Sequence, residues 1–175
     1  MKIFKQNEAA ALPEFATEGS ACFDLRACLE NEASVTAYNP HNRSMQVPVK
    51  RMVTTDSPTG RYAVSIQSNF RVLIPTGLIF DIPKNHVMNI YARSSMSLKR
   101  GLMIANGVSV IDSDYVDPTY VMIYNASDTP FAVYHGERIA QAELRELKKY
   151  ALVERKTPPT QKTEREGGIG STGTE

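Results

Sequence analysis

Short apolar runs, each cut off by residues that favour turns, recur along most of this chain. They are rich in β-branched and aromatic residues, and Pro, Gly, Asn or Asp separates each from the next. We expect strands at residues 47–54, 61–67, 70–74, 78–82, 87–92, 108–111, 120–124 and 131–134. Many short strands with turn signals between them predict an all-β barrel or sandwich. One helical turn is expected at residues 95–100, and the run at 138–149 contains helix formers that leave its structure open.

The bulk composition limits the classes of protein to which the chain can belong. At 175 residues it is long enough for one domain with a proper core. The 20 Lys and Arg residues nearly balance the 19 Asp and Glu residues, which argues against a generic nucleic-acid binder. No apolar run has transmembrane length, and the first residues lack a signal-peptide core. We therefore expect a cytoplasmic protein that binds neither nucleic acid nor membrane.

The two cysteines, Cys22 and Cys28, belong to no Cys/His cluster with metal-ligand spacing. Reduced thiols are the default interpretation for a cytosolic type of compartment. A disulfide between the two stays open as an alternative, although nothing else in the sequence supports it.

Residues 104–125 carry the most informative pattern of the chain. Two apolar runs, at 108–111 and 120–124, bracket a polar turn that contains Asp112, Asp114 and Tyr115. A carboxylate at the end of a rigid strand can act as a general base, and an aromatic ring beside it can cover a sugar or a base. The alternative is a β-turn with solvated aspartates, which is the commoner role of an Asp-x-Asp sequence.

The C-terminal part of the chain differs from the rest. From residue 158 it is polar and then glycine-rich, so it cannot form a core by itself. It is interpreted either as a disordered tail or as an arm whose backbone N–H groups bind phosphates. We therefore divide the chain into a domain at residues 1–157 and an arm at residues 158–175.

Within the domain, residues 50–68 look like an inserted hairpin that turns at residues 56–60. Surface insertions of this kind are usually decoration, and the alternative is a surface for a protein partner.

Five segments together resemble the five motifs of the trimeric deoxyuridine triphosphatases, the dUTPases. They are residues 21–27, 92–97, 104–125, 136–141 and 167–173, and the resemblance spans residues 13–173. Each motif is weak alone, but all five occur in order, with family-like spacing from the second to the fourth. The resemblance implies an all-β, jelly-roll-like fold, a homotrimer, and Mg²⁺-dependent hydrolysis of dUTP to dUMP and pyrophosphate. It also implies a strand in the first part of 138–149 and an arm that closes over a neighbouring subunit's active site.

The resemblance assigns the reaction to two groups of residues. Asp112 would orient and deprotonate the water that attacks the α-phosphorus, whereas Asp114 would fix the turn. Arg93 would serve the α-phosphate region. Ser94 and Ser95, where a strand leads into a short helix, would hold the phosphates. The alternative for this segment is an ordinary helix N-cap.

Further residues resemble the family's phosphate and metal contacts. Gln141 would donate a hydrogen bond to the phosphates, and Arg138 would make a structural or inter-subunit ion pair. Asp24 would hold Mg²⁺ through water, because a hard cation that retains waters suits one carboxylate together with the phosphates. The alternative for Asp24 is an exposed carboxylate at a strand edge.

The same resemblance places the nucleoside. Asn106 would read the uracil edge, because an amide supplies both a donor and an acceptor. Backbone groups from Gly107 to Val110 would complete this pattern in a tight hairpin without space for a thymine methyl. Tyr115 would stack on the deoxyribose and exclude a 2′-hydroxyl.

The chain departs from the usual motifs at several positions. Cys22 and Ser109 each replace a glycine, and Val116 with Asp117 replaces the usual Arg-Gly or Gln-Gly.

The fifth motif is one residue short, with Ile169 in place of the usual stacking Phe. Arg165, Gly170 and Ser171 keep the residue types that would contact the nucleotide. Ile169 would cover uracil by apolar contact and lose the aromatic stacking, which is worth about 1 kcal/mol.

Two alternatives remain for the function. A dCTP deaminase shares this fold but needs a catalytic Glu where the chain has Met122, which cannot carry protons. The same residue argues against a bifunctional enzyme. A non-catalytic regulatory or structural protein would not need all of the retained polar residues, which are Asp24, Ser94, Asn106, Asp112, Tyr115 and Gln141.

Overall fold

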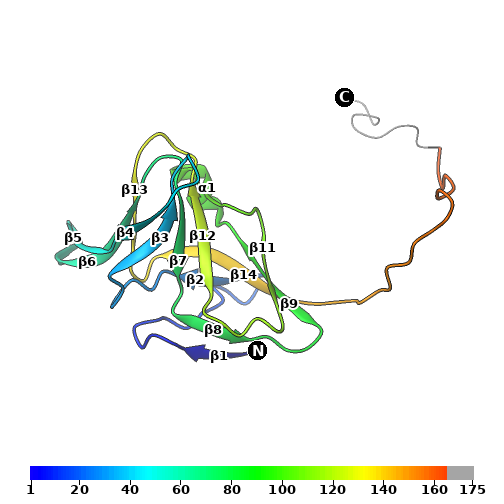
Figure 1. The fold of residues 1–175 in the computed structure, drawn as a ribbon. Helices are drawn as coiled ribbons and strands as arrows, with labels where there is room; N and C mark the ends of the chain where they lie inside the picture. The colour runs from blue at the N-terminus through cyan, green and yellow to red at the C-terminus, as the bar shows by residue number, and fades with distance from the viewer. Residues whose placement is uncertain (165–175) are drawn as a thin grey trace.

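A computed structural model describes residues 1–164, and nearly all of its regular elements are strands (Figure 1). In chain order they are β1 (Lys2–Lys5), β2 (Phe23–Arg26), β3 (Ser34–Tyr38), β4 (Ser44–Pro48), β5 (Lys50–Thr54), β6 (Ser57–Ile66), β7 (Arg71–Pro75), β8 (Leu78–Asp81), β9 (His86–Tyr91), α1 (Ser94–Arg100), β10 (Leu102–Ile104), β11 (Ser109–Asp112), β12 (Tyr120–Asn125), β13 (Phe131–Tyr134) and β14 (Arg138–Glu146). The predicted all-β class is confirmed. The helical turn is confirmed too, and it begins one residue earlier than expected.

The strands of this region form four antiparallel sheets around one hydrophobic core. Their orders are β1-β8, β10-β12-β7-β3-β4, β11-β9-β14-β2 and β13-β6-β5. Fully buried side chains from different sheets meet in the core, among them Leu25, Ile74, Ile90, Ile123 and Val64. This is the jelly-roll-like arrangement that was expected. No helix in the described part of the chain is long and apolar enough to span a membrane.

Alternation along the strands decides which side chains leave the core. In β2, Phe23 and Leu25 are buried, whereas Asp24 and Arg26 point to the other side. In β11, Ser109 is buried and Asp112 is exposed. The sheet β11-β9-β14-β2 therefore has one face on the core and one outer face that can carry polar groups.

The strand predicted at residues 47–54 is wrong in detail, because two strands occupy this region. β4 pairs with β3 and β5 pairs with β6, so the chain changes sheet at Val49. Proline lacks an N–H, so Pro48, the last residue of β4, suits the end of a ladder.

The hairpin expected at residues 50–68 is present as β5 and β6, but its turn is displaced. Thr54 pairs with Ser57, so the turn lies at residues 55–56 rather than 56–60. Gly60, with a φ of 75°, instead lies within β6, close to an irregularity in the pairing. The second half of β6 is largely buried in the core and pairs with β13, whereas the first half is mostly exposed and pairs with β5. A protein partner at this hairpin stays a prediction.

Four short strands carried too little pattern to be predicted, namely β1, β2, β3 and β10. The open run at 138–149 is resolved by β14, which covers its first nine residues as the resemblance implied. From residue 147 to residue 164 the backbone forms no regular element and runs away from the body of the protein (Figure 1).

Candidate active site

The outer face of the sheet β11-β9-β14-β2 carries predicted site residues from three strands. Asp24 on β2 lies opposite Gln141 on β14, which in turn lies opposite Tyr91 on β9. Further along β9, Val87 lies opposite Asp112 on β11. Cross-strand partners and residues two apart share a face, so Asp24, Gln141 and Asp112 all project to the same side.

At one end of this face, Asp24 joins two arginines. Its Oδ1 lies 2.9 Å from Arg93 Nε, and its Oδ2 lies 3.0 Å from Arg138 Nη1. The structural ion pair expected for Arg138 therefore exists, within the chain and with Asp24. Two guanidinium groups around one carboxylate leave a net positive charge, which favours an anion at this end of the face.

The arginines border a cavity of about 270 Å³ beside helix α1. Its lining residues are Arg93, Ser95, Met96, Lys99, Arg100, Glu137 and Arg138. Glu137 forms an ion pair with Arg100 and also accepts a hydrogen bond of 3.0 Å from the Tyr134 N–H. Counting Asp24, which pairs with two of them, four cationic side chains face two carboxylates, and this net positive charge suits a polyphosphate. Lys99 and Arg100 were not predicted from the sequence as residues of this cavity. Their position as basic residues in the last turn of a short helix could have indicated them.

Helix α1 presents its serines differently from an ordinary N-cap. The N-cap residue is Arg93, and its side chain makes no capping hydrogen bond. Ser94 and Ser95 occupy the first turn and are exposed. The alternative interpretation of these serines as a simple cap is therefore not what the structure contains.

Gln141 supports the strand-to-helix junction. Its Nε2 donates a 3.0 Å hydrogen bond to the carbonyl of Ala92, the residue before Arg93. A primary amide has two N–H donors, and this bond uses one of them. Gln141 thus holds the backbone of the second motif and retains a donor for a ligand.

Tyr91 and Glu143, which no motif indicated, occupy the middle of the outer face. The Tyr91 hydroxyl donates a 2.7 Å hydrogen bond to Glu143 Oε1, and this bond is the main cause of a raised pKa at Tyr91. Only the register between β9 and β14 brings the two side chains together.

The turn between β10 and β11 carries the predicted base-reading residues. Asn106 is exposed, and the Ser109 hydroxyl donates a 2.9 Å hydrogen bond to Asn106 Oδ1. Gly107 has a φ of 75°, a conformation that favours glycine. The wider segment is not a single hairpin, because β10 pairs with β12 whereas β11 pairs with β9. The apolar runs at 108–111 and 120–124, which are close in sequence, thus belong to different sheets.

Asp112 and Tyr115 lie together at the far end of β11. The Tyr115 N–H donates to the Asp112 carbonyl at 3.2 Å, and the Tyr115 hydroxyl donates to the Pro118 carbonyl at 2.9 Å. Burial, and then the charge of Asp117, raises the pKa of Tyr115, so the phenol remains a donor at neutral pH. Val110 projects from the same exposed face as Asp112.

Within one chain, the two ends of this face are far apart. Asp24 and Asp112 are separated by three strand spacings across the sheet and four residues along it. These offsets correspond to roughly 14 Å and 13 Å, so the Cα atoms of the two aspartates lie roughly 20 Å apart. The structure therefore gathers Asp24, Arg93, Ser95, Arg138 and Gln141 but leaves Asp112 elsewhere on the face.

Asp24 fits a contact to a cation through water better than direct coordination. Among the described residues, no group of three or more His, Cys, Asp or Glu side chains could hold a metal ion. Each Asp24 oxygen already accepts from an arginine, and a carboxylate has about four lone-pair sites. The remaining sites can accept hydrogen bonds from waters bound to a cation.

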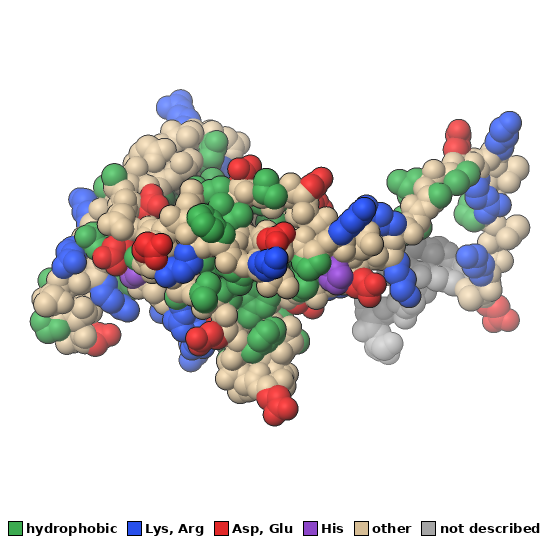
Figure 2. Space-filling model, turned by 90° about the horizontal axis from the view of Figure 1, so that it is seen from below, with side chains coloured by type: hydrophobic (Ala, Val, Ile, Leu, Met, Phe, Trp, Pro, Cys, Tyr) green, Lys and Arg blue, Asp and Glu red, His purple; other side chains and the backbone are tan. Residues whose placement is uncertain are grey.

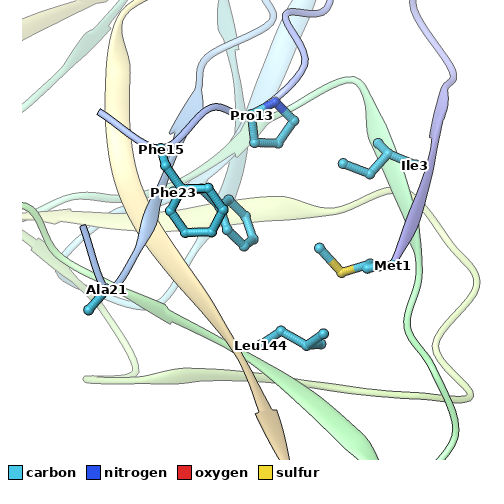
Figure 3. Close-up of a pocket in the computed structure, with 7 residues that line it drawn as sticks. All are labelled: Met1, Ile3, Pro13, Phe15, Ala21, Phe23 and Leu144. Atoms are coloured by element: carbon cyan, nitrogen blue, oxygen red, sulfur yellow. The ribbon is translucent and has the colours of Figure 1, made fainter. Parts of the chain in front are cut away.

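An apolar pocket of about 340 Å³ lies elsewhere, between β1 and the strands β2 and β14 (Figure 3). Its lining residues are Met1, Ile3, Pro13, Phe15, Ala21, Phe23 and Leu144. Hydrophobic side chains are also visible on the face that is seen from below (Figure 2). A pocket lined by these seven residues has no charged side chain for a triphosphate.

The predicted arm residues Arg165, Ile169, Gly170 and Ser171 lie outside the described residues.

Comparisons with known proteins identify the family. The family model named dUTPase matches residues 57–173. A curated relative from Dinoroseobacter shibae, deoxyuridine 5'-triphosphate nucleotidohydrolase, is 35% identical over 170 residues, which cover 95% of this chain and 90% of the relative.

Two solved structures share the fold. A point mutant of the Staphylococcus bacteriophage 80alpha dUTPase with dUpNHpp matches with a TM-score of 0.71 and 18% identity, covering 98% of this chain and 97% of that one. A mutant dUTPase from phage phi11 of S. aureus, described with a structural Mg(II) ion, matches with a TM-score of 0.64 and 16% identity over 89% and 96%. These two matches show the fold alone. The family model and the curated relative show that the chain belongs to the dUTPase family, the hydrolases that act on dUTP.

Proposed function

We propose that the protein hydrolyses dUTP to dUMP and pyrophosphate with Mg²⁺, and that Asp112 deprotonates the attacking water. The position of Asp112 carries this proposal. It stands exposed at the end of a strand that is paired with β9, and the turn after it folds Tyr115 back beside it. A carboxylate on such a rigid support can hold one water in line with a phosphorus atom.

The reaction needs one bond to form and one to break. The water oxygen bonds to the α-phosphorus, its proton goes to Asp112, and the bond from the α-phosphorus to the oxygen that bridges to the β-phosphorus breaks. Negative charge moves to the departing pyrophosphate. The cationic cavity beside α1, with Arg93 and Arg138 at its rim, is suited to stabilise this charge. Ser94, Ser95 and the second N–H of Gln141 would position the phosphates.

The cation would enter with the substrate. Mg²⁺ bound to the triphosphate would offset part of its negative charge and restrict its conformation. Both oxygens of Asp24 are already shared with arginines, which disfavours direct coordination of the ion. Asp24 would therefore contact the ion by accepting hydrogen bonds from its bound waters. The Mg(II) ion described for the phage phi11 enzyme supports a role of this metal among structural neighbours.

The active site would be shared between subunits of a homotrimer. Asp112 and the cationic cluster lie roughly 20 Å apart in one chain. At this distance, a water molecule held by Asp112 could not reach the α-phosphorus of a triphosphate bound at the cationic cluster of the same chain. A second copy would have to bring its Asp112 to the cluster, which supports the trimeric assembly that the resemblance implies.

The nucleoside would lie along β11. Asn106, with backbone groups from Gly107 to Val110, would read uracil at one end of the strand. Tyr115 would stack on the deoxyribose at the other end, with its ring held by the bond from its hydroxyl to the chain. The three residue steps from Ser109 to Asp112 span roughly 10 Å, which suits a nucleoside between its base edge and its 5'-phosphate.

The cytoplasm is the proposed compartment. Cys22 and Cys28 are both free thiols, and thiols persist in reducing surroundings. Burial is the main cause that raises the pKa of Cys28 to about 11, so this thiol stays protonated and unreactive.

Incubation of the purified protein with dUTP, dCTP and dTTP tests the proposal. We expect Mg²⁺-dependent pyrophosphate and dUMP from dUTP, with much slower turnover of the other two nucleotides. Release of ammonia from dCTP would instead indicate a deaminase. No turnover of any nucleotide would favour the non-catalytic alternative.

Deleting residues 163–175 is expected to slow dUTP turnover clearly while the folded trimer persists. The buried core contains no residue beyond Ala142, so the arm contributes nothing to it among the described residues. Ile169→Phe should lower the Michaelis constant by no more than about tenfold, which corresponds to about 1 kcal/mol of restored stacking. Steady-state kinetics and light scattering on both variants check this. Unchanged turnover after the deletion would mean that the arm takes no part in the reaction.

A further inference from the structure

We propose that Ser109 is a positioning residue that fixes the orientation of the Asn106 amide and thereby favours uracil over cytosine. The inference rests on the proposed function, because it assumes that Asn106 reads the base. Its basis is the hydrogen bond of 2.9 Å from Ser109 Oγ to Asn106 Oδ1.

The environment of Ser109 makes this bond directional. Ser109 begins β11 opposite Ile90, on the core side of the sheet, and only 7% of its surface is exposed. The Asn106 oxygen is the acceptor that the structure gives for its hydroxyl proton. If the amide turned over, the Ser109 proton would face an NH₂ group, and a buried donor would lose its acceptor.

The opposite end of the amide is thereby determined. Asn106 itself is exposed in the turn between β10 and β11. Two backbone hydrogen bonds hold this turn. The Gly107 N–H donates to the Ile104 carbonyl, and the Val108 N–H donates to the Asn106 carbonyl. The bond from Ser109 uses one of the two lone pairs of Oδ1, so the other can still accept a hydrogen bond from a ligand. The NH₂ group is held at the opposite end of the amide, where it offers donors.

Donors at this position separate the two pyrimidines. Uracil carries a carbonyl oxygen at position 4, which accepts a hydrogen bond, whereas cytosine carries an amino group there, which donates. An NH₂ group facing this position satisfies uracil and leaves two opposed donors with cytosine. Selectivity then depends on Ser109, although its side chain points toward the core rather than toward the ligand.

The test compares dUTP and dCTP hydrolysis by the full-length enzyme and its Ser109→Ala variant. Loss of the hydroxyl lets the amide rotate, so we expect the ratio of the two kcat/KM values to fall by about tenfold, roughly the effect of one buried hydrogen bond. The change should appear mainly in KM for dUTP, with kcat nearly constant, because the base lies away from the reacting phosphorus. Ser109→Thr, which keeps a hydroxyl, should restore the ratio. Ser113→Ala, in the exposed turn after Asp112, serves as the matched control.

The outcomes separate this inference from the proposed function. If the wild-type protein does not prefer dUTP, the proposed function fails. If it prefers dUTP and Ser109→Ala keeps the full ratio, the inference alone is wrong. A variant that loses thermal stability and slows both nucleotides equally would show a purely structural Ser109, and this also contradicts the inference.

Discussion

Replacing Asp112 with Asn is expected to reduce dUTP turnover by about 10²–10⁴-fold, the usual contribution of a positioned general base. Asn keeps the shape of the side chain but cannot accept the proton of the attacking water. Because Asp112 is exposed at the end of β11, the substitution should leave the fold intact. Pyrophosphate release measures the turnover, and calorimetry with a non-hydrolysable dUTP analogue measures binding, which should persist.

Asp114→Asn is the matched control, since it changes a carboxylate in the same exposed turn. Its effect on turnover should be small if Asp114 only shapes the turn. Near wild-type turnover by Asp112→Asn with intact binding would rule out the proposed base. An equal loss for both variants would indicate that the turn depends on its charges rather than on one catalytic carboxylate.

Mixing two inactive variants tests whether the site is shared between subunits. Asp112→Asn and Arg93→Ala should each be impaired alone. After dissociation and reassembly together, about a quarter of shared sites would contain both native residues, and activity should return to a comparable fraction. A site built within one chain would recover no activity, because every subunit carries one defect.

Replacing Gly77 with Ala is expected to lower the free energy of unfolding by about 2–5 kcal/mol, from left-handed backbone strain and overpacking together. Gly77 has a φ of 69°, and an added Cβ would lie 2.8 Å from Ala10 Cβ and 2.9 Å from Cys28 Sγ. Ala10 and Cys28 belong to the buried core and have little room to move. Urea denaturation at a fixed protein concentration measures the change.

Gly136→Ala separates the two causes. Gly136 has a φ of 77°, but an added Cβ would meet no heavy atom within 4 Å. Its cost should be only the backbone term, about 1–2 kcal/mol. If both variants lost the same amount of stability, the close contacts at Gly77 would be of no consequence.

Local pattern predicted the class of the fold and many of its elements. Strands at 120–124 and 131–134 were expected almost at their true bounds, because β-branched and aromatic residues between turn signals reflect preferences of single segments. The same local logic failed at Val49, where the chain leaves one sheet for another. It also failed at Gly60, where a glycine within a strand was interpreted as part of the turn. Both errors concern pairing partners, which a single segment does not specify.

The residue types of the candidate site were likewise present in the sequence. The chemistry of a carboxylate and a tyrosine in one short stretch suggested Asp112 and Tyr115 as site residues, and the resemblance to the dUTPases added Asn106. A sequence motif does not specify, however, how far apart in space residues on different strands lie. The contacts of Asp24 with Arg93 and Arg138, and the bond between Tyr91 and Glu143, follow from the pairing of β2, β9 and β14.

The sequence by itself therefore determined the all-β class, the helical turn that begins within the second motif, and the chemical groups available for a reaction. Only the tertiary structure decided that Asp24 and Asp112 share a face yet lie roughly 20 Å apart. It also decided that Ser109 turns its hydroxyl to Asn106. The physical reason is that residue type and local spacing act within a few residues of the chain. Strand register instead depends on how distant segments bury their apolar sides in one common core.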